Sequence, residues 1–152
     1  MSASVNWYFQ EIDTQLGIDS VYRHIQEINY GNKDLHSDFP AYWLESSLKI
    51  SPIEQVELLT KLHDNRFGFA PENIRAVKDA IRLSSSNGRT LYGKTGTGRV
   101  ADKNVNGWFV GYIETTDNTY FFATNIKDDK SATGNNAAKI TLSILEDMNV
   151  WK

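Results

Sequence analysis

The 152-residue chain has no cysteine, only three prolines and no long hydrophobic run. The absence of cysteine excludes disulfides, thiol catalysis and cysteine-based zinc sites. The apolar runs are far shorter than the roughly 18 residues of a membrane span, and residues 1–16 lack the basic and apolar regions of a signal peptide. The chain also lacks an excess of positive charge, with 16 Lys and Arg against 19 Asp and Glu, and it has no polybasic segment. Nucleic acid is therefore not expected as a partner.

The first half of the chain and its last segment show helical periodicity. Apolar residues recur every three or four positions, and helix start and stop signals flank them. The clearest start signal is Ser51-Pro52-Ile53-Glu54, a capping box with proline at the first helical position. Helices are expected over residues 4–16, 19–28, 52–64, 71–81 and 136–148, the first capped by Ser4, the third with Ile53, Val56 and Leu59 inward, and the last with Ile140, Ile144 and Met148 inward.

Strand-like sequence begins at Arg89. Three strand candidates, 89–95, 107–115 and 118–126, predict an antiparallel meander, and the last two are rich in β-branched and aromatic residues. A turn is expected over 84–88 and a loop over 128–134. Helices followed by strands and a final helix predict an α+β fold in which helices cover an antiparallel sheet. The strand over 89–95 would have one unpaired edge, through which oligomers are expected to form.

The segment Lys94-Thr95-Gly96-Thr97-Gly98 combines one cation, two hydroxyls and two glycines. Glycine lets a ligand lie close to backbone N–H groups, and lysine offers a positive charge to an anion. These features indicate the wall of a carboxylate-binding cleft. On these residues alone, a glycine-rich hairpin with a solvated lysine is an equal alternative.

Six segments together resemble the penicillin-recognising serine proteins in order and spacing. They are Ser4-Val5-Asn6, Tyr30-Gly31-Asn32, Tyr42-Trp43-Leu44-Glu45, residues 48–57, Lys94-Thr95-Gly96-Thr97-Gly98 and Gly107-Trp108-Phe109-Val110-Gly111-Tyr112. The chain is similar to class D (OXA-type) β-lactamases and more closely to the extracellular sensor domains of BlaR/MecR-type receptors. The resemblance covers almost the whole chain. It implies β-lactam antibiotics as partners and neither a cofactor nor a metal.

The resemblance also implies roles for individual residues. Ser4 would relay protons between the nucleophile and the lactam nitrogen, and Lys94 would attract the substrate carboxylate. Thr95 and Thr97 would hydrogen-bond that carboxylate along the Gly96 backbone, with the N–H of Thr97 as half of the oxyanion hole. Further substrate-binding positions implied by the resemblance are Asn6, Trp43 and Leu44.

Several of these residues have plainer interpretations. Ser4 is also a favoured helix N-cap, and both roles can hold together. Trp43 and Trp108 would otherwise be core or cleft-wall aromatics, and Tyr30-Gly31-Asn32 a helix end and turn. The three histidines, His24, His36 and His63, show no metal-ligand spacing and are interpreted as surface residues.

The family's nucleophile, in a Ser-x-x-Lys motif before the second motif, has no counterpart here. Ser46-Ser47-Leu48-Lys49 has the same spacing but follows the second motif, which argues against a catalytic role. Residues 1–152 are therefore expected to be the C-terminal portion of one penicillin-binding domain, with the N-terminal half as a missing partner that supplies the nucleophile and the first strands.

Asn6 bears on which family member this is. Class D hydrolases usually have an apolar residue at this position, whereas the receptors resemble this chain in having asparagine. A polar amide would change the surroundings of the lysine that acts as deacylation base and would favour a long-lived acyl-serine. The resemblance therefore implies a sensor at the extracellular face of the plasma membrane, as part of a larger membrane receptor. The alternatives are a secreted class D β-lactamase and a catalytically silent structural fragment.

Overall fold

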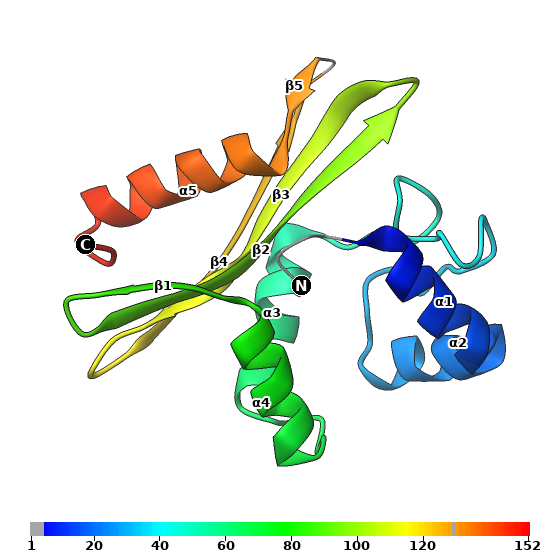
Figure 1. Cartoon of the computed structure of the whole chain (residues 1–152), viewed down its shortest axis with the longest axis horizontal. Coiled ribbons are helices and arrows are strands. Elements are labelled where there is room, and N and C mark those ends of the chain that lie inside the picture. Colours follow the sequence, from blue (N-terminus) through cyan, green and yellow to red (C-terminus); the bar gives the residue numbers. More distant parts are fainter. Residues whose placement is uncertain (1–4, 129) are drawn as a thin grey trace.

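An antiparallel sheet runs through the structure, with helix α5 on one face and helix α3 on the other (Figure 1). The computed structural model describes residues 5–128 and 130–152. Its helices are α1 (Asn6–Leu16), α2 (Ile18–Glu27), α3 (Pro52–His63), α4 (Pro71–Ala80) and α5 (Gly134–Asp147), and its strands are β1 (Arg82–Ser86), β2 (Arg89–Val100), β3 (Lys103–Glu114), β4 (Thr119–Lys127) and β5 (Ser131–Ala132). None of the helices within these described ranges has the length and apolar character needed to cross a membrane.

The sheet confirms the predicted α+β class but has five strands instead of three. Its order is β1-β2-β3-β4, and β5 pairs in parallel with β3 in the segment that was predicted to be a loop. The predicted turn over 84–88 was wrong at its start, because Ser84, Ser85 and Ser86 belong to β1 and pair with β2. The turn itself is Asn87-Gly88, with φ of 51° and 74°. Asn-Gly suits a tight hairpin because both residues tolerate positive φ.

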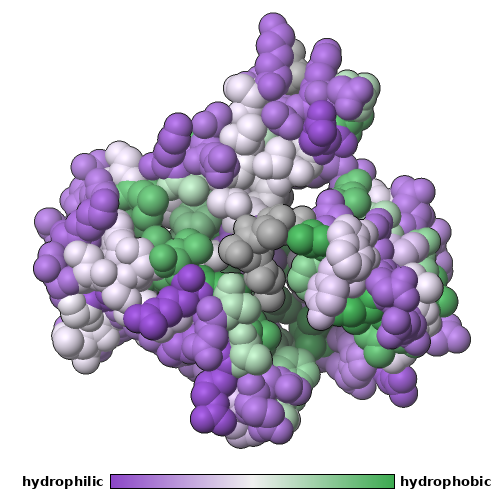
Figure 2. Space-filling view, in the orientation of Figure 1, coloured by the Kyte–Doolittle hydropathy of each residue, from purple (hydrophilic) through white to green (hydrophobic). Residues whose placement is uncertain are grey.

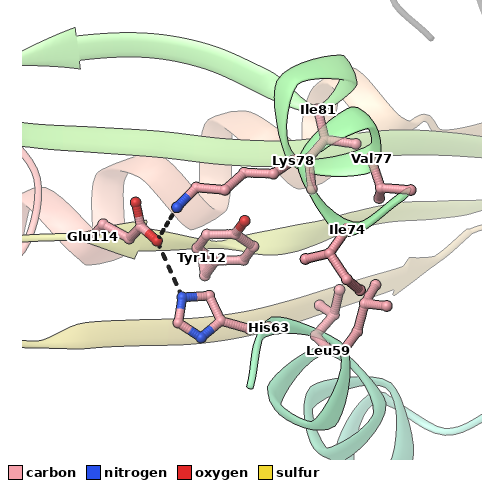
Figure 3. Close-up of a pocket in the computed structure, with 9 residues that line it drawn as sticks. Leu59, His63, Ile74, Val77, Lys78, Ile81, Tyr112 and Glu114 are labelled. Carbon is pink, nitrogen blue, oxygen red and sulfur yellow. Dashed lines mark hydrogen bonds and ion pairs between the residues drawn. The ribbon is translucent and has the colours of Figure 1, made fainter. Parts of the chain in front are cut away.

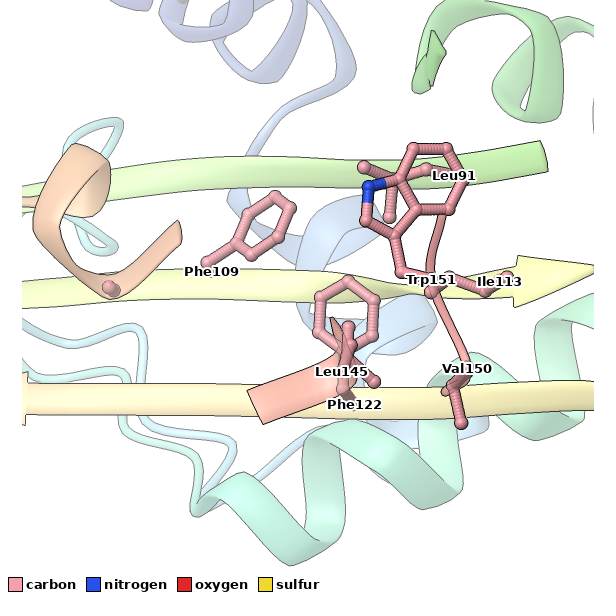
Figure 4. Close-up of a cluster of buried hydrophobic side chains, with 8 residues drawn as sticks. Leu91, Phe109, Ile113, Phe122, Leu145, Val150 and Trp151 are labelled. Carbon is pink, nitrogen blue, oxygen red and sulfur yellow. The ribbon is translucent and has the colours of Figure 1, made fainter. Parts of the chain in front are cut away.

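Side chains alternate between the two faces of the sheet. Phe109 and Ile113 of β3 point to the α5 face and are almost completely buried, at 2% and 0% exposure. They form the main hydrophobic cluster, in which the last turn of α5 and the C-terminal residues Val150 and Trp151 cover the strands (Figure 4). The opposite face carries Tyr112, which packs beneath α3 and α4 (Figure 3).

Helix α5 is oriented differently from the prediction. Its buried side chains are Ala137, Thr141 and Leu145, whereas the predicted inward residues Ile140, Ile144 and Met148 are 45%, 50% and 61% exposed. The apolar arc of this helix is wider than one sheet can cover, so part of it stays at the surface. The helix also begins two residues earlier than predicted, at Gly134, with Thr133 as its cap.

Helices α1 and α2, with the loops up to residue 51, form a separate part of the molecule beside the sheet, here called the α1–α2 part (Figure 1). Its buried residues are Val21, Leu35 and Tyr42. Helix α1 begins at Asn6 after an N-cap at Val5, and the predicted cap Ser4 lies outside the described residues. The helix has no buried residue, and its apolar side chains are exposed.

Helix α3 begins as its sequence predicts. Ser51 Oγ accepts from the Glu54 N–H at 3.2 Å, and Glu54 Oε2 accepts from the Ser51 N–H at 2.8 Å, which confirms the capping box. Leu59 is buried against the sheet, but Ile53 is 73% exposed, so its predicted core position was wrong. Ile53 lies in the first turn of the helix, away from the strands that cover Leu59.

Candidate active site

The segment Lys94–Gly98, here called the motif strand, lies in the middle of β2. One of its edges pairs with no strand in the described ranges and is here called the open edge. Strand β1 pairs with β2 only up to Tyr92, and the Gly93 N–H donates to Ile81 O at 2.8 Å. Beyond Gly93, no strand in the described ranges pairs with this edge. The predicted unpaired edge is thus confirmed for the motif strand but not for the start of β2.

The backbone groups of Thr95 and Thr97 face this open edge. In a regular strand, alternate residues present their N–H and C=O groups to the same side, and Gly93 presents its N–H there. The pairing of β2 with β3 is continuous from Thr90 to Gly98, so the alternation holds through the motif. The N–H of Thr97, the predicted oxyanion donor, is therefore directed toward the open edge of the strand.

Lys94 lies at the same edge. Its Nζ donates to Thr95 O at 2.6 Å, and partial burial lowers the pKa of the ammonium group. A low-dielectric setting strengthens the attraction between this cation and an anionic ligand. Gly96, two residues on, is exposed and lies opposite Trp108 of β3, so it leaves space above the strand.

The side chains of Thr95 and Thr97 point to the other face of the sheet, toward α5. The Gly134 N–H donates to Thr97 Oγ1 at 2.9 Å, and a Cβ on Gly134 would lie 2.8 Å from Thr95 Cβ. The N-terminus of α5 therefore packs directly behind the motif strand. The Thr97 hydroxyl keeps its own proton for donation, so its role toward a substrate carboxylate stays a prediction.

The loop of residues 42–49, here called the Trp43 loop, is anchored by Asn32. The Asn32 Nδ2 donates to Ser47 O at 2.8 Å, and its Oδ1 accepts from the Lys49 N–H at 2.9 Å. Gly31 is required for this approach, because a Cβ there would overlap the Lys49 carbonyl. The Tyr30-Gly31-Asn32 turn thus holds a loop as well as ending a helical segment.

The Trp43 loop is also tied to α1. The Tyr42 hydroxyl donates to Asp13 Oδ2 at 2.8 Å, and the rings of Tyr42 and Trp43 meet edge to face at 4.8 Å. Burial raises the pKa of the Asp13 carboxyl, although the hydrogen bond from Tyr42 opposes that rise. Trp43 is half-buried and Leu44 is 41% exposed. Their substrate-binding roles stay predictions.

One contact between the Trp43 loop and the motif strand was missed from the sequence. The carboxylate of Glu45 lies over Gly98, and its Oε1 accepts from Asn106 Nδ2 at 2.7 Å. The partners are 61 residues apart, so no spacing rule reveals them.

The remaining predicted site residues are at or beyond the described boundary. Asn6 occupies the first position of α1 and is exposed. Ser4, the predicted proton relay, lies outside the described residues. Ser46, of the second Ser-x-x-Lys sequence, is in a bent loop, where its Oγ donates to Asp38 Oδ2 at 2.9 Å. The Ser46–Lys49 segment is not helical, so the one-turn arrangement that a nucleophile and its lysine need is absent there.

A cavity of about 290 Å³ lies between α3, α4 and the face of the sheet that carries Tyr112 (Figure 3). At its polar side, Glu114 Oε1 accepts from Lys78 Nζ at 2.6 Å and from His63 Nε2 at 3.0 Å. Burial alone would raise the pKa of Glu114, but the hydrogen bonds from Lys78 and His63 outweigh it and lower the pKa. His63 is half-buried against Tyr112, so its prediction as a surface residue was wrong.

No cluster of metal ligands occurs in the part of the chain that the structure describes. The geometry instead offers backbone donors, one lysine and an aromatic loop around an open strand edge. Such an edge can hydrogen-bond an extended ligand as an added strand would. The donors can also stabilise an oxyanion formed beside them.

Comparison with known proteins assigns the family. The penicillin-binding protein transpeptidase domain matches residues 1–146. The chain belongs to this family. The regulatory protein BlaR1 of Bacillus licheniformis is 51% identical over 152 residues, covering 99% of this chain and 25% of BlaR1. The solved C-terminal domain of the Bacillus licheniformis BlaR penicillin-receptor superposes with a TM-score of 0.92 at 50% identity, over 100% of this chain and 61% of that domain.

Class D β-lactamases are similar as well. The class D enzyme of Bacillus subtilis superposes with a TM-score of 0.91 at 36% identity, over 100% of this chain and 62% of the enzyme. The predicted resemblance to BlaR/MecR sensor domains and class D enzymes is therefore confirmed, and so is the α+β fold. This chain spans about a quarter of BlaR1 and about three-fifths of the solved domain.

Proposed function

We propose that this chain is the C-terminal part of a β-lactam sensor domain. In its complete form the domain is acylated by β-lactam antibiotics and signals resistance. The observation that carries the proposal is the open edge of the motif strand, where Lys94 Nζ bonds to Thr95 O and toward which the Thr97 N–H is directed. Lys94 attracts the carboxylate of the antibiotic, and the Thr97 N–H stabilises the oxyanion of acyl transfer, a contribution of about 2.7–4 kcal/mol for such a donor.

Residues 1–152 are the C-terminal portion of one penicillin-binding domain in this proposal. Exposed apolar surface on α1 and α5 supports it, because a complete domain rarely leaves such side chains uncovered. Figure 2 shows hydrophobic residues at the surface on both sides of the furrow between the α1–α2 part and the remainder. The N-terminal half of the domain covers this surface and brings the nucleophile, while the chain alone associates through the open strand edge.

A sensor is favoured over a hydrolase by the 51% identity to BlaR1, against 36% to the Bacillus subtilis class D enzyme. Asn6, at the first position of α1, favours it too. In a sensor the acyl-serine must persist, and a polar amide near the base disfavours its hydrolysis. The domain then belongs to a receptor at the extracellular face of the plasma membrane, whereas a class D hydrolase would be secreted.

The decisive experiment is intact-mass spectrometry with benzylpenicillin. The 152-residue chain alone is expected to gain no penicilloyl mass, because no described Ser-x-x-Lys pair has a helical arrangement. The same chain joined to the upstream part of the B. licheniformis BlaR domain is expected to gain one. Failure of the joined protein to react would favour the catalytically silent alternative. An adduct on the chain alone that Ser46→Ala abolishes would make Ser46 the nucleophile.

A second measurement separates sensor from hydrolase in the joined protein. Acylation should be rapid and deacylation should take hours. Asn6→Val removes the amide and is expected to speed deacylation by about tenfold, which corresponds to about 1.4 kcal/mol of barrier. Lys94→Ala should slow acylation instead, since the substrate loses an attracting charge. Many nitrocefin turnovers per second in the unmodified protein would establish the class D hydrolase.

A further inference from the structure

The carboxylate of Glu45 lies over Gly98 and beside Asn106, in a site here called the seat. The seat exists only because residue 98 is glycine. A Cβ on Gly98 would overlap the Cγ, Cδ and Oε1 atoms of Glu45. Gly98 lies directly opposite Asn106 in the β2–β3 ladder, so the two positions share one face of the sheet. The carboxylate thus lies over the backbone of one strand and accepts from a side chain of the next, at 2.7 Å.

The hydrogen bonds continue from Asn106 to a third residue, Asn125. Asn125 Nδ2 donates to Asn106 Oδ1 at 2.6 Å and lies 3.3 Å from Gly107 O. These bonds fix the orientation of the Asn106 amide, so that its Nδ2 is the group presented to Glu45. The seat is therefore formed by residues of β2, β3 and β4.

The contact crosses from the α1–α2 part of the molecule to the sheet. No other hydrogen bond between described residues links the α1–α2 part to the sheet. Glu45 follows Trp43 and Leu44 directly, and Gly98 ends the motif strand. One carboxylate thus links the Trp43 loop to the end of the motif strand.

We propose that Glu45 is a positioning residue, and that its seat over Gly98 and Asn106 sets the separation between the Trp43 loop and the motif strand. The role in antibiotic recognition rests on the proposed β-lactam function, but the positioning itself does not. The hydrogen bond is charge-assisted, and its donor Asn106 lies on a strand of the sheet. Groups on strands are held more precisely than groups on loops, so this bond can fix the position of the Trp43 loop relative to the sheet.

Hydrogen exchange of the 152-residue chain tests the positioning. The amides of Leu44, Leu48 and Lys49 report on the Trp43 loop, since each donates to an acceptor within the loop or beside it. Gly98→Ala should expel the flexible Glu45 side chain and raise exchange of these amides about tenfold, as expected for loss of one charge-assisted bond. Gly96→Ala is the matched control, because its Cβ would meet only Trp108 Cβ at 3.7 Å.

Three further variants show whether the seat is responsible. Glu45→Ala should match Gly98→Ala, and combining the two should add nothing, because the seat is empty in each. Glu45→Gln keeps an acceptor oxygen and should restore most of the protection. Equal loop exchange in Gly98→Ala and Gly96→Ala, or full additivity in the double variant, would overturn the proposal.

Acylation of the joined protein tests the consequence for the cleft. Glu45→Ala and Gly98→Ala should each lower the second-order rate constant for benzylpenicillin about tenfold, and Glu45→Gln should recover most of it. A merely structural role would lower the melting temperature without this recovery. If the unmodified protein does not react, the β-lactam function fails while the exchange result stands. If exchange changes but acylation does not, the proposed control of the cleft is wrong.

Discussion

The sheet with α5 and the α1–α2 part are held together in different ways. Eight buried residues form the cluster between α5, the strands and the C-terminus, whereas three form the cluster of the α1–α2 part. The smaller cluster is supplemented by side-chain hydrogen bonds, among them those of Tyr42 and Asn32. The proposed cleft lies where these parts meet, so one wall is rigid and the other depends on a few polar contacts.

The largest effect is expected in the cluster beneath α5. Phe109→Ala removes a ring that is 2% exposed and contacts Phe122, and it should lower the free energy of unfolding by about 3–5 kcal/mol. Urea denaturation followed by tryptophan fluorescence measures the loss. Ile144→Ala on the exposed side of α5 is the control and should stay within about 0.5 kcal/mol. Similar losses for both would mean that α5 is packed by its other face.

A smaller and more local effect is expected for Tyr42→Phe. The variant leaves the ring in place but removes the hydrogen bond to Asp13, which is worth about 1.5–3 kcal/mol for a charged acceptor. Hydrogen exchange should rise in α1 and the Trp43 loop and stay unchanged in β3. Faster exchange throughout the sheet would show that the two parts unfold together, contrary to the comparison.

The capping box where the loops enter α3 provides a third test. Ser51→Ala removes the acceptor for the Glu54 N–H and should cost about 1 kcal/mol. The matched control is Ser46→Ala, whose hydroxyl bonds only within the exposed loop. Thermal unfolding by circular dichroism compares them. A cost for Ser46→Ala as large as that for Ser51→Ala would mean that the α1–α2 part contributes more to global stability than its small cluster indicates.

The smallest expected effect is a pH dependence of the bonds that join Glu114 of β3 to His63 of α3 and Lys78 of α4. The folded pKa of Glu114 is lowered, so this carboxylate stabilises the fold fully above its unfolded pKa, and the stabilisation is lost as the pH falls through its folded pKa. Glu114→Gln should therefore flatten the decline of unfolding free energy over the acidic range, measured by urea denaturation at a series of pH values. An unchanged decline would show that Lys78 and His63 do not stabilise the ionised carboxylate.

Much of the site was accessible from short stretches of sequence. The capping box at Ser51, the Asn87-Gly88 turn and the motif strand are local patterns whose geometry follows from a few neighbouring residues. The order of six such motifs was enough to predict the family and the fold class, and both are confirmed. The role of Ser4 stays a prediction, because that residue lies outside the described ranges.

Other features depended on partners that are distant in the sequence. Serine-rich β1 is a strand because β2 pairs with it, and α5 buries Ala137 instead of Ile140 because the sheet covers only one side of a wide apolar arc. His63 is half-buried because Glu114, 51 residues away, accepts from it. Glu45 likewise reaches its seat only when Gly98 and Asn106 are brought opposite each other. The sequence by itself determined the local conformations and the family, whereas tertiary packing decided which faces are buried, since burial depends on what lies across the fold.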